Sequence, residues 1–213
     1  MELYSYFRSS ASFRVRIALA LKGLSANYHG VHLQRGEQAS PAFAAVLPQQ
    51  LVPALQDEGS TLTQSLAIIE YLEERHPEPP LLPADALGRA RVRALALMVA
   101  CEIHPLNNLR VLRYLVRELG VSEDAKNAWY RHWVEQGLAE LEGQLSAHPG
   151  TGLYCHGDQP GLADCVLVPQ IFNAKRFDCR LDHVPTVMRI FDQCMSLPAF
   201  QAAQPSACPD AEA

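Results

Sequence analysis

A cluster of prolines divides the sequence into two parts of different character. The segment His76-Pro77-Glu78-Pro79-Pro80, followed closely by Pro83, cannot continue a helix, because proline has no backbone N–H and its ring clashes with the preceding turn. Such a segment is typical of a semi-rigid linker. The 213 residues of the chain suffice for a small domain before the linker and a larger one after it. We therefore predict one domain over residues 1–80 and a second over residues 86–213.

The part before the linker alternates between strand-like and helix-like patterns. Strands are predicted over residues 2–6, 27–33, 51–56 and 60–63, and helices over 14–22, 41–46 and 64–75. Gly23 is suited to a helix C-cap, and Asp57-Glu58-Gly59 is a turn signal for an antiparallel hairpin. The order βαβ, α, ββα places a parallel and an antiparallel pair of strands in one mixed sheet with helices on its faces. This is a thioredoxin-like pattern.

Almost everything after the linker has a helical pattern. Apolar residues recur at helical spacing over residues 88–119, over 123–147 and, most strongly, over 162–174. Trp129 and Trp133 share one face of the second of these helices, where we expect them to lie in the core. The second domain is therefore predicted to be a bundle of helices, and the fold class of the chain is α/β plus all-α.

Charge and targeting signals argue against several classes of partner. The net charge is −5 and the lysines and arginines are scattered, whereas nucleic-acid binding needs a basic stripe. Met1 leads directly into a strand-like segment, without the charged and apolar regions of a signal peptide or a membrane span. We expect a cytoplasmic protein that binds neither nucleic acid nor membranes.

The cysteines form no metal or disulfide framework that the sequence reveals. None belongs to a C-x-x-C pair, and none has His or Cys neighbours at zinc-finger spacing. We interpret them as reduced, mostly structural thiols and expect no metal site. The six are Cys101, Cys155, Cys165, Cys179, Cys194 and Cys208.

The loop after the first predicted strand is the strongest candidate for chemistry. In a thioredoxin-like module this loop runs into a helix N-terminus, which favours an anion such as a thiolate. Here it reads Arg8-Ser9-Ser10-Ala11-Ser12, with hydroxyls and a guanidinium but no sulfur, so a reactive thiol has to come from another molecule. A serine that donates a hydrogen bond to a bound thiolate lowers the thiol pKa. The alternative is that these serines only cap the helix, and the two roles are compatible.

Two further loops are placed to hold an extended ligand. A cis bond before Pro53 would present the backbone of Val52 to a peptide, although the sequence does not reveal the isomer. Gln64 and Ser65 stand where a strand becomes a helix, so they could hold a carboxylate or simply cap the helix. Together the three loops predict a site for one extended, glutathione-like ligand.

From its first helix onward the sequence resembles a known family. The run Ser9-Ser10-Ala11-Ser12-Phe13-Arg14-Val15-Arg16-Ile17-Ala18-Leu19-Ala20-Leu21-Lys22-Gly23 closely resembles the SSCSxRVRIALALKG signature of zeta-class glutathione transferases. The resemblance continues through residues 51–55, 64–74, 103–108 and 162–170 and covers nearly the whole chain. It implies the glutathione transferase fold, with glutathione bound by residues 1–80, substrate bound by residues 86–213, and a homodimer. Ala11 departs from the pattern, since many members have cysteine there, and this excludes disulfide exchange at that position.

The resemblance also implies a role for each matching position. Ser9 would stabilise the glutathione thiolate, with Ser10 and the backbone of Ala11 nearby. Arg8 and Arg176 would hold the substrate carboxylate and stabilise an enolate. The remaining glutathione contacts would come from Gln38, Val52, Pro53, Gln64, Ser65, His104 and Asn108, and the substrate pocket would include His104 and Arg110.

The implied activity is a glutathione-dependent cis–trans isomerisation in aromatic compound catabolism. The substrate would be a maleyl keto-dicarboxylate, either maleylacetoacetate or maleylpyruvate, and the product its fumaryl isomer. Addition of a thiolate to the cis double bond permits rotation, and its expulsion leaves the trans isomer. Two alternatives stay open: glutathione conjugation or dehalogenation of small 2-halo acids, and a non-catalytic transferase-like module used for protein interaction.

Several of the site residues have a structural alternative. Arg8 and Arg176 could each form only a surface ion pair. Arg110 begins a series of arginines at i, i+3 and i+7 that could form one solvated helix face. His104, before Pro105, could be a satisfied histidine between the domains rather than a ligand contact.

Overall fold

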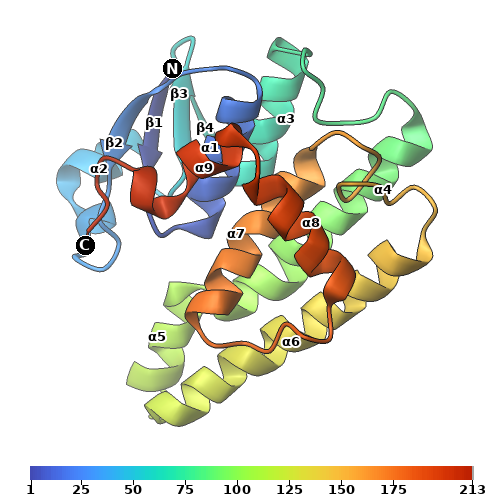
Figure 1. The fold of residues 1–213 in the computed structure, drawn as a ribbon. Coiled ribbons are helices and arrows are strands. Elements are labelled where there is room, and N and C mark those ends of the chain that lie inside the picture. Colours follow the sequence, from blue (N-terminus) through green and yellow to red (C-terminus); the bar gives the residue numbers. More distant parts are fainter. Residues whose placement is uncertain (213) are drawn as a thin grey trace. The chain divides into compact units, whose positions relative to one another are not determined.

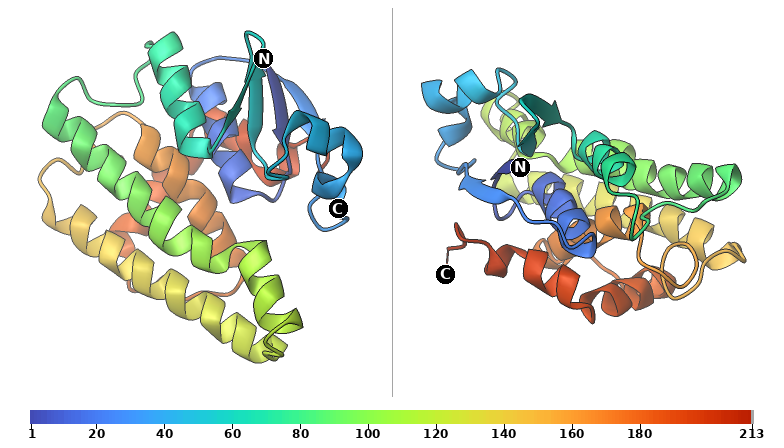
Figure 2. Two further views of the ribbon diagram at one scale, coloured as in Figure 1. Left: turned by 180° about the vertical axis from the view of Figure 1, so that it is seen from behind. Right: turned by 90° about the horizontal axis from the view of Figure 1, so that it is seen from above.

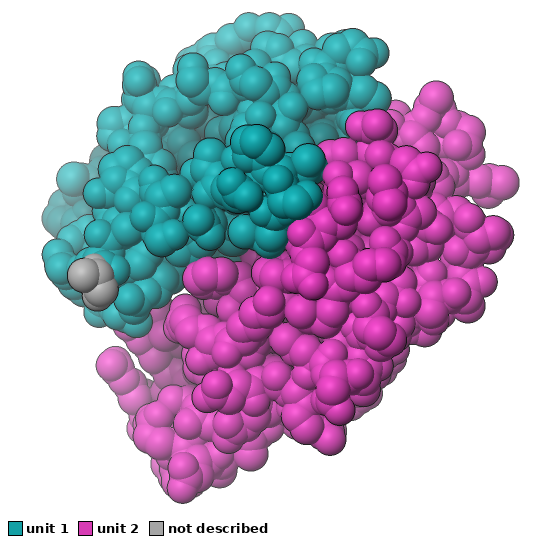
Figure 3. Space-filling model, in the orientation of Figure 1, with its two compact units in different colours: residues 1–81, 195–213 teal, residues 82–194 magenta. Residues whose placement is uncertain are grey.

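The structure is a computed structural model that describes residues 1–212 (Figure 1). Unit 1 contains residues 1–81 together with the C-terminal residues from 195 onward, and unit 2 contains residues 82–194 (Figure 3). The first division falls within one residue of the predicted boundary at residue 80. Residues 195–212 group with unit 1, whereas the sequence placed them with the residues after the linker.

Unit 1 is built on a four-stranded mixed sheet of order β2-β1-β3-β4. Strand β1 runs parallel to β2 and antiparallel to β3, and β3 runs antiparallel to β4. This confirms the predicted thioredoxin-like arrangement of a parallel and an antiparallel pair. The elements are β1 (Glu2–Ser5), α1 (Ser10–Leu21), β2 (Asn27–Gly30), η1 (Glu37–Ala39), α2 (Pro41–Val46), β3 (Ala54–Asp57), β4 (Ser60–Thr63) and α3 (Ser65–Arg75).

Local hydrogen bonds explain where some predicted boundaries were wrong. Helix α1 begins at Ser10 rather than Arg14, because Ser9 caps its first turn by accepting a hydrogen bond from the Ser12 N–H. Strand β2 ends at Gly30 because the chain turns at His32, whose N–H donates to the Glu37 carboxylate.

Helix α1 is buried on most sides because α3 and α9 (Pro198–Ala203) both pack against it (Figure 2). Its buried residues include Arg14 and Arg16, which are only 3% and 8% exposed. A buried guanidinium must be hydrogen-bonded to be tolerated. Arg14 donates to the Ser65 hydroxyl, and Arg16 donates to the Ala203 carbonyl in α9. Helix α9, near the C-terminus, is thus hydrogen-bonded to α1.

A buried ion pair anchors the proline-rich segment to unit 1. The Lys22 ammonium, at the end of α1, lies 2.7 Å from the Glu73 carboxylate of α3 and has a fully buried side chain. It also donates to the backbone carbonyls of His76 and Pro79, at 2.7 and 3.0 Å. Glu73 in turn accepts from the N–H of Leu81. The linker is therefore fixed along its length by polar groups of two helices.

Unit 2 is helical, as predicted, but the long helix expected over residues 88–119 is wrong. It is divided into α4 (Ala86–Leu97), the π-helical segment η2 (Met98–Ile103), the 3-10 turn η3 (His104–Asn107) and α5 (Leu109–Arg117). Pro105 interrupts a regular helix there, because it has no N–H to donate to the preceding turn. The remaining helices are α6 (Glu123–Ala147), α7 (Leu162–Arg176) and α8 (Pro185–Met195), whose last residue belongs to unit 1.

The tryptophans of α6 lie beside its core stripe rather than in it. The fully buried residues of α6 are Tyr130, Val134, Leu138, Leu141 and Leu145. Trp129 and Trp133 each precede one of these by one residue, which rotates them away from the stripe, and both are half-buried. The core position expected for the pair is therefore corrected. No helix within residues 1–212 is long and apolar enough to cross a bilayer.

Candidate active site

Three loops of unit 1 leave the sheet at the same edge. Tyr4, near the end of β1, lies opposite Ala54 at the start of β3, and Ala54 lies opposite Thr63 at the end of β4. The loop after β1, the Val52-Pro53 segment before β3 and the Gln64-Ser65 segment after β4 therefore meet at one edge. The Val52–Pro53 bond is cis, the isomer on which its predicted role depended.

Ser9 lies at the N-terminus of α1, where its hydroxyl hydrogen is still available to donate a hydrogen bond. Its Oγ accepts a hydrogen bond from the Ser12 N–H at 3.2 Å, and its own N–H donates to the Tyr6 carbonyl at 2.9 Å. A hydroxyl oxygen can accept while its hydrogen donates elsewhere. Ser9 can thus cap the helix and donate to an anion at once. Ser12, by contrast, is fully buried inside unit 1, so the predicted loop offers fewer accessible hydroxyls than its sequence suggested.

Arg8 rests on an aromatic platform next to Ser9. Its guanidinium lies 4.8 Å from the centre of the Phe7 ring, and Phe7 is only 3% exposed. Such stacking holds the cation while leaving its N–H groups to bind a carboxylate. The Arg8 ion pair that was the alternative does not occur within residues 1–212. Ser10 is buried and Ala11 is half-buried in the first turn of α1.

The segment that begins α3 is strained and polar. Gln64 has φ 66° and ψ 113°, a conformation that is costly for a residue with a side chain and that clusters at ligand clamps. Its side chain makes no capping bond to the helix, so the simple cap considered for Gln64 is wrong. Ser65 is 6% exposed, and its Oγ accepts from the Arg14 guanidinium at 3.2 Å. Unbonded N–H groups in the first turn of α3 and the nearby guanidinium together favour an anion.

Gln38 and Val52 complete the part of the site that lies in unit 1. Gln38 belongs to η1, and its Oε1 is buried without a hydrogen-bond partner within residues 1–212. A buried amide oxygen of this kind normally has a donor, which a ligand can supply. Val52 packs against the apolar cluster of Tyr6, Phe7 and Cys208, so it lies close to the loop that carries Arg8 and Ser9.

Four of the buried cysteines have raised thiol pKa values. Five are buried and Cys101 is exposed, and all six are free thiols. Burial raises the pKa of Cys155, Cys194 and Cys208, and raises that of Cys179 to about 11. A thiol with a raised pKa stays protonated near neutral pH and reacts poorly. No group of His, Cys, Asp and Glu within the described chain is arranged to hold a metal ion.

The candidate residues of unit 2 lie on two segments that both contact the start of α6. His104 is half-buried in η3, where the Leu106 carbonyl accepts from the Trp129 indole N–H at 2.9 Å. Asn108 caps α5, since its Oδ1 accepts from the Arg110 N–H at 3.1 Å. The Arg110 side chain is exposed on the first turn of α5.

Arg176 occupies the last residue of α7 and is exposed. Its guanidinium lies 4.9 Å from the centre of the Phe177 ring, and that ring stacks on Tyr130 of α6 at 3.9 Å. Burial raises the pKa of Tyr130, and the positive charge of Arg176 opposes part of that rise. Both η3 and the end of α7 therefore contact the first half of α6, through Trp129 and Tyr130.

Arg14 supports the candidate site, although we predicted no role for it from the sequence. It supports Ser65 from inside unit 1 and so connects the first helix to the segment after β4. A signal was present, because Arg14 and Arg16 interrupt an otherwise apolar helix and charged residues in such a setting need partners. The identity of those partners depends on the tertiary fold and was not readable from the sequence.

Comparison with known proteins agrees with this geometry. Residues 3–80 match the model of the glutathione S-transferase N-terminal domain, and residues 124–191 match that of the C-terminal domain. The maleylacetoacetate isomerase of Pseudomonas aeruginosa is 52% identical over 216 residues, covering all of both chains. The maleylpyruvate isomerase of a Ralstonia species is 50% identical over 210 residues, covering 99% of both.

Solved structures show the same relationship. A holo structure of maleylpyruvate isomerase, described as a bacterial glutathione S-transferase of the zeta class, has a TM-score of 0.97 at 50% identity and covers both chains fully. A maleylacetoacetate isomerase from Anaeromyxobacter dehalogenans, with dicarboxyethyl glutathione and citrate in its active site, has a TM-score of 0.88 at 46% identity. That match covers 100% of this chain and 97% of the other.

These matches span the chain, which therefore belongs to the glutathione S-transferase family. Its mixed sheet followed by helices is the fold of that family. Within the family the chain is assigned to the zeta class, as the resemblance of its first helix implied.

Proposed function

We propose that this protein is a glutathione-dependent cis–trans isomerase that converts maleylacetoacetate or maleylpyruvate to the fumaryl isomer. The observation that carries the proposal is Ser9, whose hydroxyl stands at the start of α1 with its O–H free to donate, in a loop without cysteine. Two relatives of about half identical sequence bear the names of these two isomerases. The relative with dicarboxyethyl glutathione in its active site further supports chemistry between glutathione and an unsaturated dicarboxylate.

The residues at the sheet edge fit glutathione. Its γ-glutamyl carboxylate would be held by Gln64, Ser65 and the first N–H groups of α3, which lie beside the Arg14 cation. The backbone of Val52, ahead of Pro53, would pair with the peptide part of the ligand. Gln38 would gain the donor that its buried Oε1 lacks. His104 and Asn108 would add contacts from unit 2.

The chain has to stabilise charge rather than move protons. Bound glutathione supplies the sulfur that adds to the cis double bond, allows rotation about the resulting single bond and then departs. Ser9 favours the thiolate form by donating its hydroxyl hydrogen, and the first turn of α1, with Ser10 and the Ala11 N–H, adds partial positive charge. Arg8 and Arg176 would hold the substrate carboxylate and stabilise the negative charge that moves onto its oxygen, and Arg110 and His104 would line the pocket.

An isomerase assay tests the function directly. Enzyme, glutathione and either maleyl substrate are mixed, and the loss of the enol absorbance is followed. Turnover that depends on glutathione supports the proposal, and no loss above the uncatalysed rate with either substrate refutes it. Release of chloride from a dihaloacetate would favour the transferase and dehalogenase alternative. Retention on glutathione resin without turnover of any substrate would favour a non-catalytic module.

The proposal extends to the setting in which the enzyme works. We expect a homodimer in the cytoplasm, with a small dicarboxylate and glutathione as its ligands and no nucleic acid or membrane partner. The net charge of −5 supports the absence of a nucleic-acid partner. Light scattering tests the assembly, since a dimer has twice the chain mass of 23.5 kDa.

A further inference from the structure

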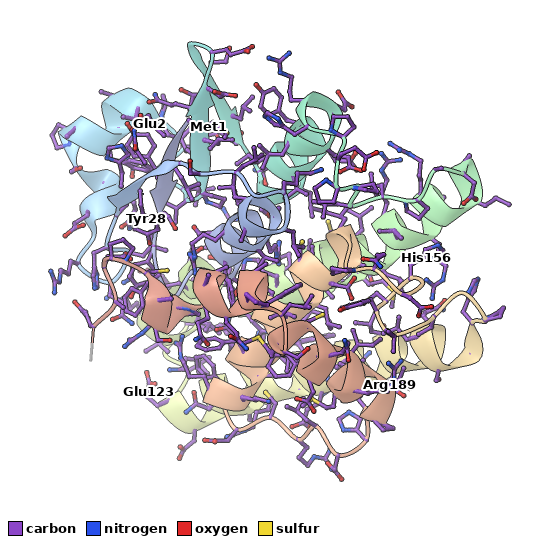
Figure 4. The ribbon with its side chains drawn as sticks, turned by 45° about the horizontal axis from the view of Figure 1, so that its top comes forward. Met1, Glu2, Tyr28, Glu123, His156 and Arg189 are labelled. Atoms are coloured by element: carbon purple, nitrogen blue, oxygen red, sulfur yellow. The ribbon has the colours of Figure 1, made fainter. Side chains whose placement is uncertain are left out.

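The C-terminal segment of the chain returns to the loop that carries Ser9. Asp210 accepts a hydrogen bond from the Phe7 N–H at 3.2 Å through Oδ2 and one from the Tyr28 hydroxyl at 2.6 Å through Oδ1. Figure 4 marks Tyr28, which belongs to β2 of unit 1. Both partners are donors, so both carboxylate oxygens are needed as acceptors. Burial, with the hydrogen bond to Asp210, raises the pKa of Tyr28, so that hydroxyl remains a donor.

The backbone of Phe7 is hydrogen-bonded through both its N–H and its carbonyl. Its N–H binds Asp210, and its carbonyl accepts from the Arg16 guanidinium at 3.0 Å. Arg16 is itself held at 2.9 Å by the Ala203 carbonyl of α9. The Phe7 ring carries the Arg8 guanidinium, and Ser9 follows two residues later. The backbone that presents both side chains is thus held by Asp210, 203 positions away, and by Arg16, which is itself bound to α9.

Two features show that the close approach of Asp210 is specific. A Cβ on Gly30 would lie 3.2 Å from the Cβ of Asp210, so a larger residue at this position of β2 would require Asp210 to shift. Beyond it, Glu212 binds the ring of His32 at 3.1 Å and the guanidinium of Arg35. The segment is therefore attached to the β2 side of the module on both sides of the Asp210 contact, through Cys208 and through Glu212.

We propose that Asp210 is a positioning residue for the active-site loop: it fixes the Phe7 peptide so that Ser9 and Arg8 are presented in the orientation that thiolate stabilisation needs. This rests on the proposed role of Ser9 in a glutathione site. A hydrogen bond to a charged sulfur depends steeply on its angle and length, so a loop that fluctuates loses much of its effect on the thiol pKa.

The test compares Asp210→Asn and Gly30→Ala with Asp192→Asn, which removes an exposed carboxylate from α8. The asparagine cannot accept from both donors, and the alanine displaces the intact aspartate by steric contact. Hydrogen exchange of the backbone over residues 7–12 is measured without any ligand. Both test variants should exchange there roughly 10-fold faster than wild type, with little change in the remaining strands of unit 1, and the control should not.

A second set of measurements tests how each variant changes the thiol pKa of glutathione and the rate of turnover. The thiol pKa of bound glutathione, titrated by thiolate absorbance, should rise by about one unit in both test variants. Isomerase turnover should fall about 10-fold at neutral pH, recover at higher pH, and leave the affinity for glutathione within about twofold. A merely structural role would instead lower affinity, turnover and thermal stability together.

The proposal is overturned by unchanged exchange over residues 7–12 in both test variants, by acceleration spread evenly through unit 1, or by equal effects in Asp192→Asn. If wild-type enzyme does not lower the thiol pKa of glutathione, the proposed function fails. The exchange measurement still decides whether Asp210 fixes the loop, because it requires no ligand.

Discussion

Replacement of Ser9 separates the two roles that its geometry combines. In Ser9→Ala the Ser12 N–H loses its capping acceptor, which costs about 1 kcal/mol of stability. The donor to the thiolate is lost as well, and a hydrogen bond to a charged group contributes roughly 1.5–3 kcal/mol. That free energy corresponds to a rise of about one to two units in the thiol pKa, since one unit equals about 1.4 kcal/mol. Turnover at neutral pH should therefore fall roughly 10- to 100-fold.

Two further variants separate the contribution of the helix cap to stability from the contribution of the hydrogen bond to the thiolate. Ser9→Asp keeps an N-cap acceptor but has no donor and places a negative charge beside the sulfur, so stability should be retained while turnover is lost. Ser122→Ala is the matched control, because Ser122 caps α6 through the same kind of bond to the Ala125 N–H, also at 3.2 Å. It should show the stability cost of a lost cap without a change in thiol pKa.

The assay measures three quantities for each variant: the free energy of unfolding in urea, the affinity for glutathione, and the pH profile of turnover. We expect Ser9→Ala to lower turnover far more than it lowers glutathione binding, and its pH profile to shift upward. If turnover and binding fall equally, or neither changes, Ser9 serves only as a helix cap. Activity of Ser9→Asp near that of wild type would refute the thiolate argument outright.

Three other predictions follow from buried contacts and shifted pKa values. Lys22→Met should cost about 3–5 kcal/mol in urea unfolding, because the buried Glu73 carboxylate loses its cation and two backbone carbonyls lose the donor they have in Lys22, whereas a loss below about 1 kcal/mol would contradict a buried pair. Gly137→Ala should cost about 1–3 kcal/mol, since a Cβ there would lie 2.4 Å from Cγ1 of Ile103, and unchanged stability would mean that η2 repacks freely. Burial and the Arg91 guanidinium lower the pKa of His156, so the unfolded chain binds its proton more readily and stability declines as pH falls below about 6.5. Urea unfolding of His156→Gln at pH values on both sides of that range should show a weaker pH dependence than wild type, and an identical dependence would refute this assignment.

Much of the fold was predictable because its signals are local. The order of strands and helices in residues 1–75 followed from alternation and turn residues, and Glu58 and Gly59 indeed adopt left-handed conformations in the predicted hairpin. The bounds of α6 matched the prediction, since Ser122 caps its start. The prediction of one helix over residues 88–119 was wrong, because helical spacing of apolar residues does not distinguish a continuous α-helix from one interrupted by a π-helical turn and Pro105.

For the candidate site, too, some features could be predicted from the sequence and others could not. That three loops share one edge of the sheet could be predicted from strand order and register, and the structure has that register. The hydrogen bonds that hold those loops in place could not be predicted. Arg14 with Ser65, and Asp210 with Phe7, are separated by 51 and 203 residues, so no local pattern brings them together. Cis–trans isomerism at Pro53 was likewise open until the structure gave the bond as cis.

The return of the C-terminal segment to unit 1 has a consequence for biosynthesis. The partners of Arg16 and Phe7 in unit 1, Ala203 and Asp210, are translated only after the whole of unit 2. A nascent chain that has completed its sheet therefore still exposes the face of α1 that α9 will cover. A chain that ends before residue 198 would contain the linker and the helices of unit 2. It would lack α9 and Asp210, which complete unit 1. Unit 1 can therefore be completed only after the helices of unit 2 have been synthesised.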